Sequence, residues 1–484
     1  MTDLRVPALT LRSELWIGGR NVPSSDGGLF PVYDPADGTL LAEVADATPD
    51  DGRRALDAAA AAQPGWAATS SRTRAEILRR AWELIQERRN EVAAVITAEM
   101  GKPLSESLGE VTYGGEFLRW FAEEAVRING RYTTSPSGAG QILVTKEPVG
   151  PTLAITPWNF PLAMGTRKIA PALAAGCTMI VKPAPETPLT MLLLAEIFTE
   201  AGLPAGVLSV LPTSDAAALT GPLLDDPRLA KITFTGSTGT GKLLLRAAAD
   251  NVLRSSMELG GNAPLIVFDD ADISAAVDGA LAAKMRNGGQ ACVAANRIYV
   301  DNKVREQFTA ELTDRMRDLT VGCGSAEGTD VGPLINERQR GVVAELVDDA
   351  VAKGARLLLG GRSVDGPGFF YEPTVLADIP ADARLVTEEV FGPVAAIIGF
   401  DDEDEAVAAA NATRYGLAAY VFTEGLDRAM RVSRAIQAGM VGVNRGIMSD
   451  VAAPFGGYKE SGLGRESGSE GIEEYLETKY IALR

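Results

Sequence analysis

The sequence predicts an α/β protein with two tandem lobes, each built on a parallel sheet, and a small β hairpin that projects from the first lobe. Short apolar runs alternate with Ala- and Leu-rich helical segments from about residue 150, and the same alternation restarts after Glu258. Residues 126–147 are turn-rich and show no helical period. Strands that alternate with helices are typical of βαβ units around a buried parallel sheet.

Each predicted element follows from local periodicity. Residues 47–125 are predicted to be helical, because apolar side chains in stretches such as "RAEILRRAWELIQERR" recur at helical spacing. Strands of the first lobe are expected at 152–156, 178–182, 207–211 and 231–236. Strands of the second lobe are expected at 263–268, 297–301, 355–361, 395–400, 417–423 and 440–444. The final "EEYLETKYIALR" is expected to add an edge strand to the hairpin.

The composition limits the partners and the compartment. A net charge of −18 argues against nucleic-acid or anionic-membrane partners. Three cysteines, none with metal-ligand spacing, fit a reducing cytoplasm and no bound metal. The start "MTDLRVPALTLRSELWIGG" lacks the apolar core of a signal peptide, and the apolar runs are shorter than the ~20 residues of a membrane span. We therefore expect a cytoplasmic protein.

The chain contains no histidine, and this absence restricts the chemistry. Ser-His-Asp triads, Cys-His dyads and His-ligated zinc are all excluded. A general base in this protein must therefore be Glu, Asp, Lys or Tyr.

The stretch "ITFTGSTGTGKLLL" resembles a phosphate-binding loop. Gly236, Gly241 and Lys242 satisfy most of the nucleoside-triphosphatase pattern, but Leu243 lacks the hydroxyl that would hold Mg²⁺. A strand, a Gly turn and a helix remain, an arrangement that presents backbone N–H groups to an anion. From these residues alone, cofactor binding and a plain tight turn both stay open.

Three residues are candidates for the reacting centre, and each has a structural alternative. Cys292, in "RNGGQACVAANR", is either a nucleophile or a packed core residue. Glu258, in "SMELGGNAPLIVF", is a general base with a pKa raised by its apolar context, or a salt-bridged structural residue. Asn159 either holds an oxyanion or caps a turn. Cys177 is expected to be packing, and Cys323 to be a loop thiol.

Seven stretches occur together in order: "ITPWNFP", "VKPAPETP", "FTGSTGTGK", "MELGGNAP", "NGGQACVAANR", "EEVFGPV" and "APFGGYKESGLGRE". With these the chain resembles the aldehyde dehydrogenase superfamily from about residue 14 to its end. The resemblance implies two Rossmann-like lobes. It assigns 1–125 with 148–257 to a dinucleotide-binding domain and 258–465 to a catalytic domain. Residues 126–147 with 466–484 are then an oligomerisation segment, for a homodimer or homotetramer.

The resemblance also implies a mechanism. Cys292 attacks the aldehyde, the Asn159 side chain and the Cys292 N–H hold the oxyanion, and hydride transfer leaves a thioester. Glu258 then activates water to release the acid. Residues implied to bind the nicotinamide cofactor are Thr156, Trp158, Lys182, Gly236, Ser237, Glu389 and Phe391.

The substrate is implied by Arg167, Arg286 and Ser449, which match the residues that bind the distal carboxylate in succinate-semialdehyde dehydrogenases. A guanidinium suits a carboxylate, and an arginine beside a thiol favours the thiolate. Glutarate semialdehyde, an aliphatic aldehyde and a CoA-acylating reaction are the alternatives, although the CoA-dependent branch typically lacks Glu258. Arg445 is an unusual charge that would widen the range of acidic aldehydes.

Departures from the family pattern bear on regulation and on the cofactor. Ala294 stands where some relatives carry a second cysteine, so we expect no disulfide switch. Pro185 replaces a glutamate that would repel a 2′-phosphate, so NADP is admitted beside NAD, although Glu186 would partly restore exclusion. Two unrelated readings are a phosphate-loop NTPase, which Leu243 argues against, and a catalytically silent structural protein.

Overall fold

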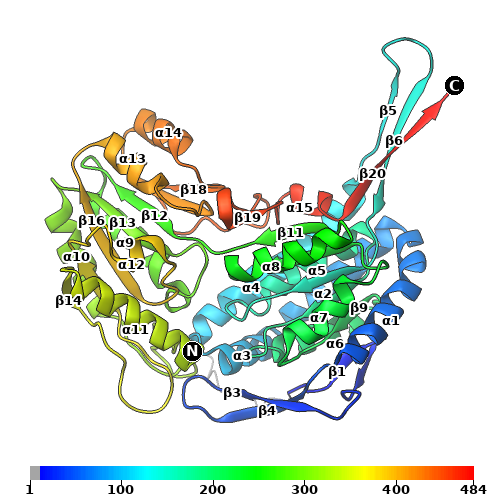
Figure 1. Ribbon diagram of the computed structural model, residues 1–484, viewed down its shortest axis with the longest axis horizontal. Coiled ribbons are helices and arrows are strands. Elements are labelled where there is room, and N and C mark those ends of the chain that lie inside the picture. Colours follow the sequence, from blue (N-terminus) through cyan, green and yellow to red (C-terminus); the bar gives the residue numbers. More distant parts are fainter. Residues whose placement is uncertain (1–10) are drawn as a thin grey trace.

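Two lobes, each with a mostly parallel sheet, and a narrow antiparallel arm make up the described part of the chain, residues 11–484 of a computed structural model (Figure 1). The predicted fold class is confirmed, except that both sheets carry antiparallel strands at their edges. The prediction that no signal peptide is present concerns residues 1–10 in part, and those lie outside the described residues. Within residues 11–484, no helix is both long and apolar enough to cross a membrane.

The first sheet runs in the order β19-β11-β10-β7-β8-β9-β1-β2. Its parallel strands are β7 (Thr152–Ile155), β8 (Met179–Lys182), β9 (Leu208–Val210), β10 (Lys231–Thr235) and β11 (Arg254–Glu258). The edges are β1 (Leu15–Ile17), β2 (Arg20–Val22) and β19 (Gly462–Leu463). The strands predicted for this lobe are confirmed. A separate hairpin is formed by β3 (Leu29–Tyr33) and β4 (Leu40–Ala45).

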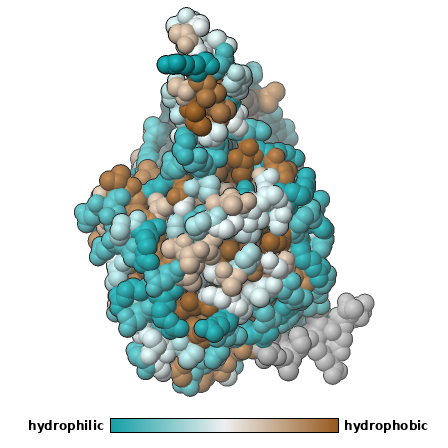
Figure 2. Space-filling model, turned by 90° about the vertical axis from the view of Figure 1, so that its right-hand side faces the viewer, coloured by the Kyte–Doolittle hydropathy of each residue, from teal (hydrophilic) through white to brown (hydrophobic). Residues whose placement is uncertain are grey.

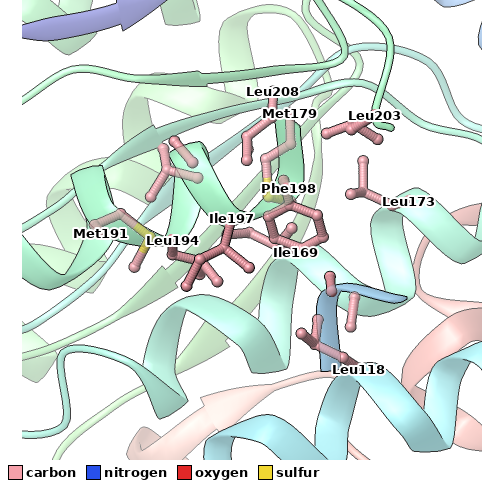
Figure 3. Close-up of a cluster of buried hydrophobic side chains, with 14 of the residues drawn as sticks. Leu118, Ile169, Leu173, Met179, Met191, Leu194, Ile197, Phe198, Leu203 and Leu208 are labelled. Atoms are coloured by element: carbon pink, nitrogen blue, oxygen red, sulfur yellow. The ribbon is translucent and has the colours of Figure 1, made fainter. Parts of the chain in front are cut away.

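Helices pack on this sheet through apolar faces. The predicted helical region consists of α1 (Pro49–Ala68), α2 (Ser71–Glu87), α3 (Arg89–Met100) and α4 (Leu104–Glu124). They are followed by α5 (Ala163–Ala175), α6 (Leu189–Glu200), α7 (Ala216–Leu224) and α8 (Thr238–Asp250). Figure 3 shows side chains of α4, α5 and α6, among them Leu118, Leu173 and Phe198, against Met179 of β8. Each such buried side chain stabilises the fold by about 1.5–3 kcal/mol relative to exposure.

The second sheet runs in the order β14-β15-β16-β13-β12-β17-β18, and only β14 pairs antiparallel. Its strands are β12 (Ala263–Val267), β13 (Ala295–Asp301), β14 (Arg356–Leu359), β15 (Thr374–Ala377), β16 (Val394–Phe400), β17 (Ala418–Phe422) and β18 (Met440–Val443). Its helices are α9 (Ile273–Met285), α10 (Arg305–Arg317), α11 (Glu337–Ala352), α12 (Arg384–Thr387), α13 (Glu403–Asn411) and α14 (Leu426–Ala435). The strands predicted for this lobe are confirmed, and β15 is additional.

The arm joins two segments that are far apart in the sequence. It consists of β5 (Arg131–Thr134), β6 (Gln141–Pro148) and β20 (Leu476–Leu483), with β6 in the middle. The predicted hairpin and the predicted C-terminal edge strand are therefore both confirmed. Figure 1 shows the arm standing away from both lobes, with the C-terminus at its tip.

The strand orders place two loops at one point of the first sheet. β7 lies between β8 and β10, so the chain leaves β7 and β10 in opposite directions along the sheet. Ligands of open α/β sheets bind at such a switch point, at the carboxyl ends of the strands. The loops that follow β7 and β10 contain Asn159 and Ser237.

The domain boundaries stay a prediction, and one element bears on them. β19 lies inside the predicted catalytic segment 258–465 but pairs with β11 of the first sheet. The chain thus returns to the first lobe before it enters the arm.

Candidate active site

A cavity of about 390 Å³ is lined by residues of both lobes, a volume in the usual range for small-molecule sites. Predicted site residues that line it are Trp158, Asn159, Arg167, Gly236, Ser237, Glu258, Arg286, Cys292, Glu389, Phe391 and Ser449. Thr156 and Lys182 are buried at the ends of β7 and β8 and are not among the described residues that line the cavity. The fold therefore brings nearly all the predicted residues together.

Cys292 lies in a tight loop between α9 and β13. Asn287, Gly288 and Gly289 have positive φ angles of 55°, 59° and 76°, a conformation that favours glycine and is tolerated by asparagine. A Cβ at Gly289 would lie 2.1 Å from Gly392 O, and a Cβ at Gly261 would lie 2.4 Å from Cys292 O. The small residues noted around this cysteine are therefore what allows its loop to pack against the neighbouring strands.

Burial of the Cys292 thiol opposes its ionisation. Burial raises its pKa to about 12, and Arg167 opposes this rise only in part. The sequence expectation that an adjacent arginine favours the thiolate is thus right in sign, but burial is the larger effect. A reaction at this sulfur needs a base that takes its proton.

Glu258 is the last residue of β11 and is only 3% exposed. Burial, and next the negative charge of Glu466, raise its pKa well above the usual value. The raised pKa predicted from the sequence is confirmed. Among the described residues, Oε2 of Glu258 has no hydrogen-bond partner, so this oxygen can take up a proton or bind water in the cavity.

Asn159 is anchored through both its side chain and its backbone. Its Nδ2 donates to Gln290 O at 3.0 Å, in the loop that carries Cys292. Its carbonyl oxygen accepts from Lys102 Nζ at 2.7 Å and from Asn287 Nδ2 at 2.9 Å. Because an amide nitrogen carries two hydrogens, one N–H of Asn159 remains for an oxyanion.

The start of α8 presents backbone N–H groups to the cavity. Ser237 is the N-cap of this helix, and its Oγ accepts from Thr240 N at 3.3 Å. A helix N-terminus next to a Gly turn favours an anionic group such as a dinucleotide pyrophosphate. Lys242, by contrast, pairs with Glu460 at 2.8 Å, and Leu243 is exposed. The loop therefore lacks both the metal ligand and a phosphate-directed lysine of an NTPase.

Two aromatic rings and two carboxylates frame the rest of this side of the cavity. Trp158 and Phe391 meet edge to face, with ring centroids 5.4 Å apart. Glu389 accepts from Gly261 N at 3.3 Å, and burial raises its pKa to about 8. Glu186 also lines the cavity and accepts from Asn336 Nδ2 at 3.4 Å. Its carboxylate is therefore held by a residue of the other lobe.

Lys182 and Thr156 are tied to each other at the edge of the sheet. Thr156 N donates to Lys182 O at 3.1 Å. Burial lowers the pKa of Lys182 to about 8, and Glu186 opposes this shift. An ammonium group that is poorly solvated in this way gains from an added acceptor, such as a ribose hydroxyl.

Two arginines occupy the opposite end of the cavity. Arg167 is 2% exposed, and its Nη2 donates to Tyr113 OH at 2.6 Å. Its Nε and Nη1 have no hydrogen-bond acceptor among the described residues, although Nη1 lies 3.6 Å from Glu466 Oε2. Arg286 stacks on Phe160, with its Cζ 4.8 Å from the ring centroid. Residues 11–484 offer Arg286 no hydrogen bond or ion pair.

Sequence reasoning missed Tyr113 and Phe455. Both line the cavity, and the Cζ of Arg167 lies 4.1 Å from the ring centroid of Phe455. Their only sequence signal is an aromatic residue on a helix and one in a Gly-rich loop, which predicts core packing as readily as a site.

The other thiols are remote from this chemistry. Cys177 is buried in the first lobe, donates to Tyr475 O at 3.4 Å, and has a pKa raised by burial to about 11. Cys323 contacts Ser325 Oγ at 3.2 Å. All three cysteines are unpaired, and in the described part of the chain no His, Cys, Asp or Glu cluster could hold a metal ion.

Comparison with known proteins gives a family and several related activities. The model of the aldehyde dehydrogenase family matches residues 22–481. The chain is 56% identical over 444 residues to a succinate-semialdehyde dehydrogenase of Paenarthrobacter nicotinovorans, covering 92% of this chain and 99% of the relative. It is 46% identical over 476 residues to a glutarate-semialdehyde dehydrogenase of Pseudomonas putida, covering 98% of both chains. It is 47% identical over 483 residues to a 3-sulfolactaldehyde dehydrogenase of Pseudomonas putida, covering 100% of this chain and 99% of the relative.

Solved structures agree in fold. An NADP-dependent enzyme of Escherichia coli superposes with a TM-score of 0.96 at 46% identity, covering 98% of both chains. A betaine aldehyde dehydrogenase of Staphylococcus aureus in complex with NAD+ superposes with a TM-score of 0.95 at 36% identity, covering 98% of this chain and 95% of the other.

Proposed function

The chain belongs to the aldehyde dehydrogenase family and is an NAD(P)-dependent aldehyde dehydrogenase of the succinate-semialdehyde dehydrogenase type, and from that premise we propose that it oxidises succinate semialdehyde to succinate. The observation that carries the proposal is the pair of arginines at one end of the cavity. Arg167 keeps two nitrogens without hydrogen-bond acceptors, and Arg286 lines the cavity without a hydrogen bond or ion pair to residues 11–484, with Glu106 acting on it only at longer range. A substrate carboxylate would satisfy both.

The residues on the other side of the cavity fit a nicotinamide dinucleotide. Backbone N–H groups at the start of α8 suit the pyrophosphate, and the buried, poorly solvated side chains of Glu389 and Lys182 suit ribose hydroxyls. The nicotinamide ring, when bound, supplies the hydride acceptor. We assign Trp158 and Phe391 to enclosing that ring and excluding water, and Thr156 and Gly236 to shaping the turns beneath it.

In the proposed reaction Cys292 is the nucleophile. Its high pKa requires that the proton leave as the sulfur attacks the aldehyde carbon, and Glu258 has an unpaired carboxylate oxygen to take it. The Asn159 amide and the Cys292 N–H would hold the resulting oxyanion, donors worth about 3–4 kcal/mol each. Glu258 must first release the thiol proton to solvent; after oxidation it takes a proton from the water that cleaves the thioester, and the departing sulfur of Cys292 is reprotonated.

The ability of Arg167 to bind a substrate carboxylate depends on how Glu466 divides its contacts between Arg167 and Lys168. Glu466 makes its shorter contact with Lys168, whereas its distance to Arg167 is 3.6 Å. Arg167 therefore shares this carboxylate with Lys168, and its Nε and Nη1 keep no hydrogen-bond acceptor among the described residues. We propose that Arg167, Arg286 and Ser449 bind the distal carboxylate together.

Other acidic aldehydes are the main competitors. Relatives named for glutarate semialdehyde and 3-sulfolactaldehyde are about as similar as several succinate-semialdehyde dehydrogenases. Arg445 is exposed, donates from Nε to Ile447 O and is not among the described residues that line the cavity, so a role in admitting such acids stays a prediction. A CoA-acylating reaction is disfavoured, because Glu258 is present and placed to activate water.

A substrate panel crossed with both cofactors tests the proposal. Succinate semialdehyde, glutarate semialdehyde, 3-sulfolactaldehyde and butanal would be oxidised with NAD+ or NADP+, with CoA absent. We expect the highest kcat/KM for succinate semialdehyde. A higher value for another acid, or for butanal, would assign the cavity to that substrate instead. A requirement for CoA would contradict the hydrolytic mechanism.

Both NAD+ and NADP+ serve as cofactors in this family, and the residues near the adenosine ribose determine which of the two is preferred. Pro185 carries no charge, whereas Glu186 faces the cavity and is engaged by Asn336. We propose that NADP+ is accepted because the Asn336 contact draws the Glu186 carboxylate away from the ribose. In the panel, a kcat/KM for NADP+ below one hundredth of that for NAD+ would refute this.

The arm is the proposed contact with a second copy of the chain. Tyr132, Tyr480, Ile481 and Leu483 are exposed on it, and Figure 2 shows hydrophobic side chains gathered on this projection. An unpaired sheet edge with exposed apolar side chains is a pairing surface. Light scattering of the intact protein should give a dimer or tetramer, and Ile481→Lys should shift it toward monomer.

A further inference from the structure

One face of α4 points at the reacting centre and carries two carboxylates with no part in the mechanism so far. Glu106, Glu110, Tyr113 and Phe117 recur at spacings of three and four and so share one side of the helix. Tyr113 and Phe117 both lie against Arg167. The two glutamates reach the loops that contain Asn159 and Cys292.

Glu110 anchors the segment that follows Asn159. Its Oε1 accepts from Leu162 N at 2.9 Å and from Ala163 N at 3.1 Å, at the start of α5. Its Oε2 accepts from Lys102 Nζ at 2.6 Å, and both side chains are completely buried. A carboxylate with three N–H donors is a rigid anchor for the loop to which those donors belong.

Lys102 and Asn287 hold the peptide carbonyl of Asn159 from opposite lobes. Lys102 Nζ donates to Asn159 O at 2.7 Å and lies 3.9 Å from the ring centroid of Phe160. Asn287 Nδ2 donates to the same oxygen at 2.9 Å. The backbone of Asn159 is therefore fixed relative to the loop of Cys292 and not only to its own sheet.

Glu106 completes the connection between the lobes. Its Oε2 accepts from Asn287 N at 2.7 Å. Asn287 has a φ of 55°, so its backbone leaves the common helical and extended conformations and depends on its contacts to stay there. A single helix of the first lobe thus holds both loops that meet at the reacting atoms.

We propose that Lys102, Glu106 and Glu110 are positioning residues that keep the Asn159 amide in register with the Cys292 loop. The proposal rests on the roles assigned above to Asn159 and Cys292. If the three residues served folding alone, their loss would lower stability without a selective effect on the oxidation step. As positioning residues, they matter because a misplacement of about 1 Å at an active site costs about 100-fold in rate.

Glu106→Leu and Glu106→Gln test the contact between the lobes. Leucine cannot accept from Asn287 N, whereas the Gln side-chain oxygen can. We expect kcat with butanal to fall about 10- to 100-fold in Glu106→Leu and to recover at least tenfold in Glu106→Gln. The KM for the cofactor and the rate of Cys292 alkylation by iodoacetamide should stay within twofold, because neither uses the oxyanion donor.

Glu110→Leu and Glu99→Leu form a matched pair. Glu99 is also a buried carboxylate that accepts two N–H groups at a helix start, those of Leu189 and Thr190 at 2.7 and 3.0 Å. Both variants should lower Tm, but only Glu110→Leu should lower kcat of the folded fraction. If Glu110→Leu does not fold, the Glu106 pair decides alone.

Three results would overturn the positioning role: unchanged kcat in Glu106→Leu, a fall of kcat and alkylation in equal proportion, or an equal loss of kcat in Glu99→Leu. Cys292→Ala is assayed alongside. If it alone loses turnover, the chemistry stands and the positioning role fails. If Cys292→Ala keeps turnover, the proposed function itself fails.

Discussion

Replacing Arg286 by Met tests the carboxylate grip most directly. Met keeps an unbranched stem that can lie on Phe160, where the guanidinium Cζ now lies 4.8 Å from the ring centroid, but it carries no charge. Arg286 is only partly buried and has no ion pair within residues 11–484, but its charge opposes the rise that burial causes in the pKa of Glu106. Comparing an acidic with an uncharged substrate therefore separates the contribution of this cation to carboxylate binding from its effect on Glu106.

The magnitude follows from one charge-assisted hydrogen bond. Such a contact is worth about 1.5–3 kcal/mol, and each 1.36 kcal/mol is tenfold, so kcat/KM for succinate semialdehyde should fall roughly 10- to 150-fold. For butanal, which has no carboxylate, the fall should be less than about threefold. The measured quantity is the ratio of the two kcat/KM values, with turnover followed by the absorbance of the reduced nicotinamide.

Arg338→Met is a matched control. Arg338 lines the same cavity but lies in α11, outside the proposed carboxylate grip, so the ratio for this variant should equal that of the parent. Equal losses on both substrates in Arg286→Met would refute the reasoning.

The other predictions concern the thiol and its base. Cys292→Ala should abolish oxidation while Tm stays within a few degrees, and residual steady turnover would contradict a covalent intermediate. Glu258→Gln cannot accept a proton, so kcat should fall about 10²- to 10⁴-fold; a kcat within threefold of the parent would contradict its role. Because burial raises the pKa of Cys292 to about 12, the thiol stays protonated below that pH, and alkylation of the cofactor-free enzyme should quicken about tenfold per pH unit between pH 7 and 9. A plateau of the rate near pH 7 would show that the thiolate already predominates there.

The strands that were predicted have apolar runs, whereas those that were missed are either short, such as β1 (LWI) and β15 (TVLA), or polar. β11 is the clearest case, because "RSSME" has the composition of a loop. It is nevertheless a buried strand, since Ser256 donates to Glu474 at 2.9 Å and contacts Lys231. These partners lie in β10 and near the C-terminus, so no local pattern could reveal that the polar side chains would be satisfied.

The same distinction separates the site residues that could be predicted from those that could not. Cys292, Glu258 and Asn159 stand in Gly- and Pro-rich stretches after strands, where a functional side chain is an obvious alternative to packing. Lys102 lies just before a helix and Glu110 lies within it, so the sequence predicts that both charged side chains are exposed to solvent. Their burial results from the long-range approach of Asn159 and α5, which a single sequence does not display.

The arm also determines where the protein can be engineered. Leu476 to Leu483 pair residue by residue with Pro148 to Gln141, so these residues form an outer strand of the arm and not a loose tail. Shortening the chain by eight residues would bare the edge of β6 and invite precipitation. An affinity handle fused behind Arg484 would directly extend this paired strand and is therefore best avoided there.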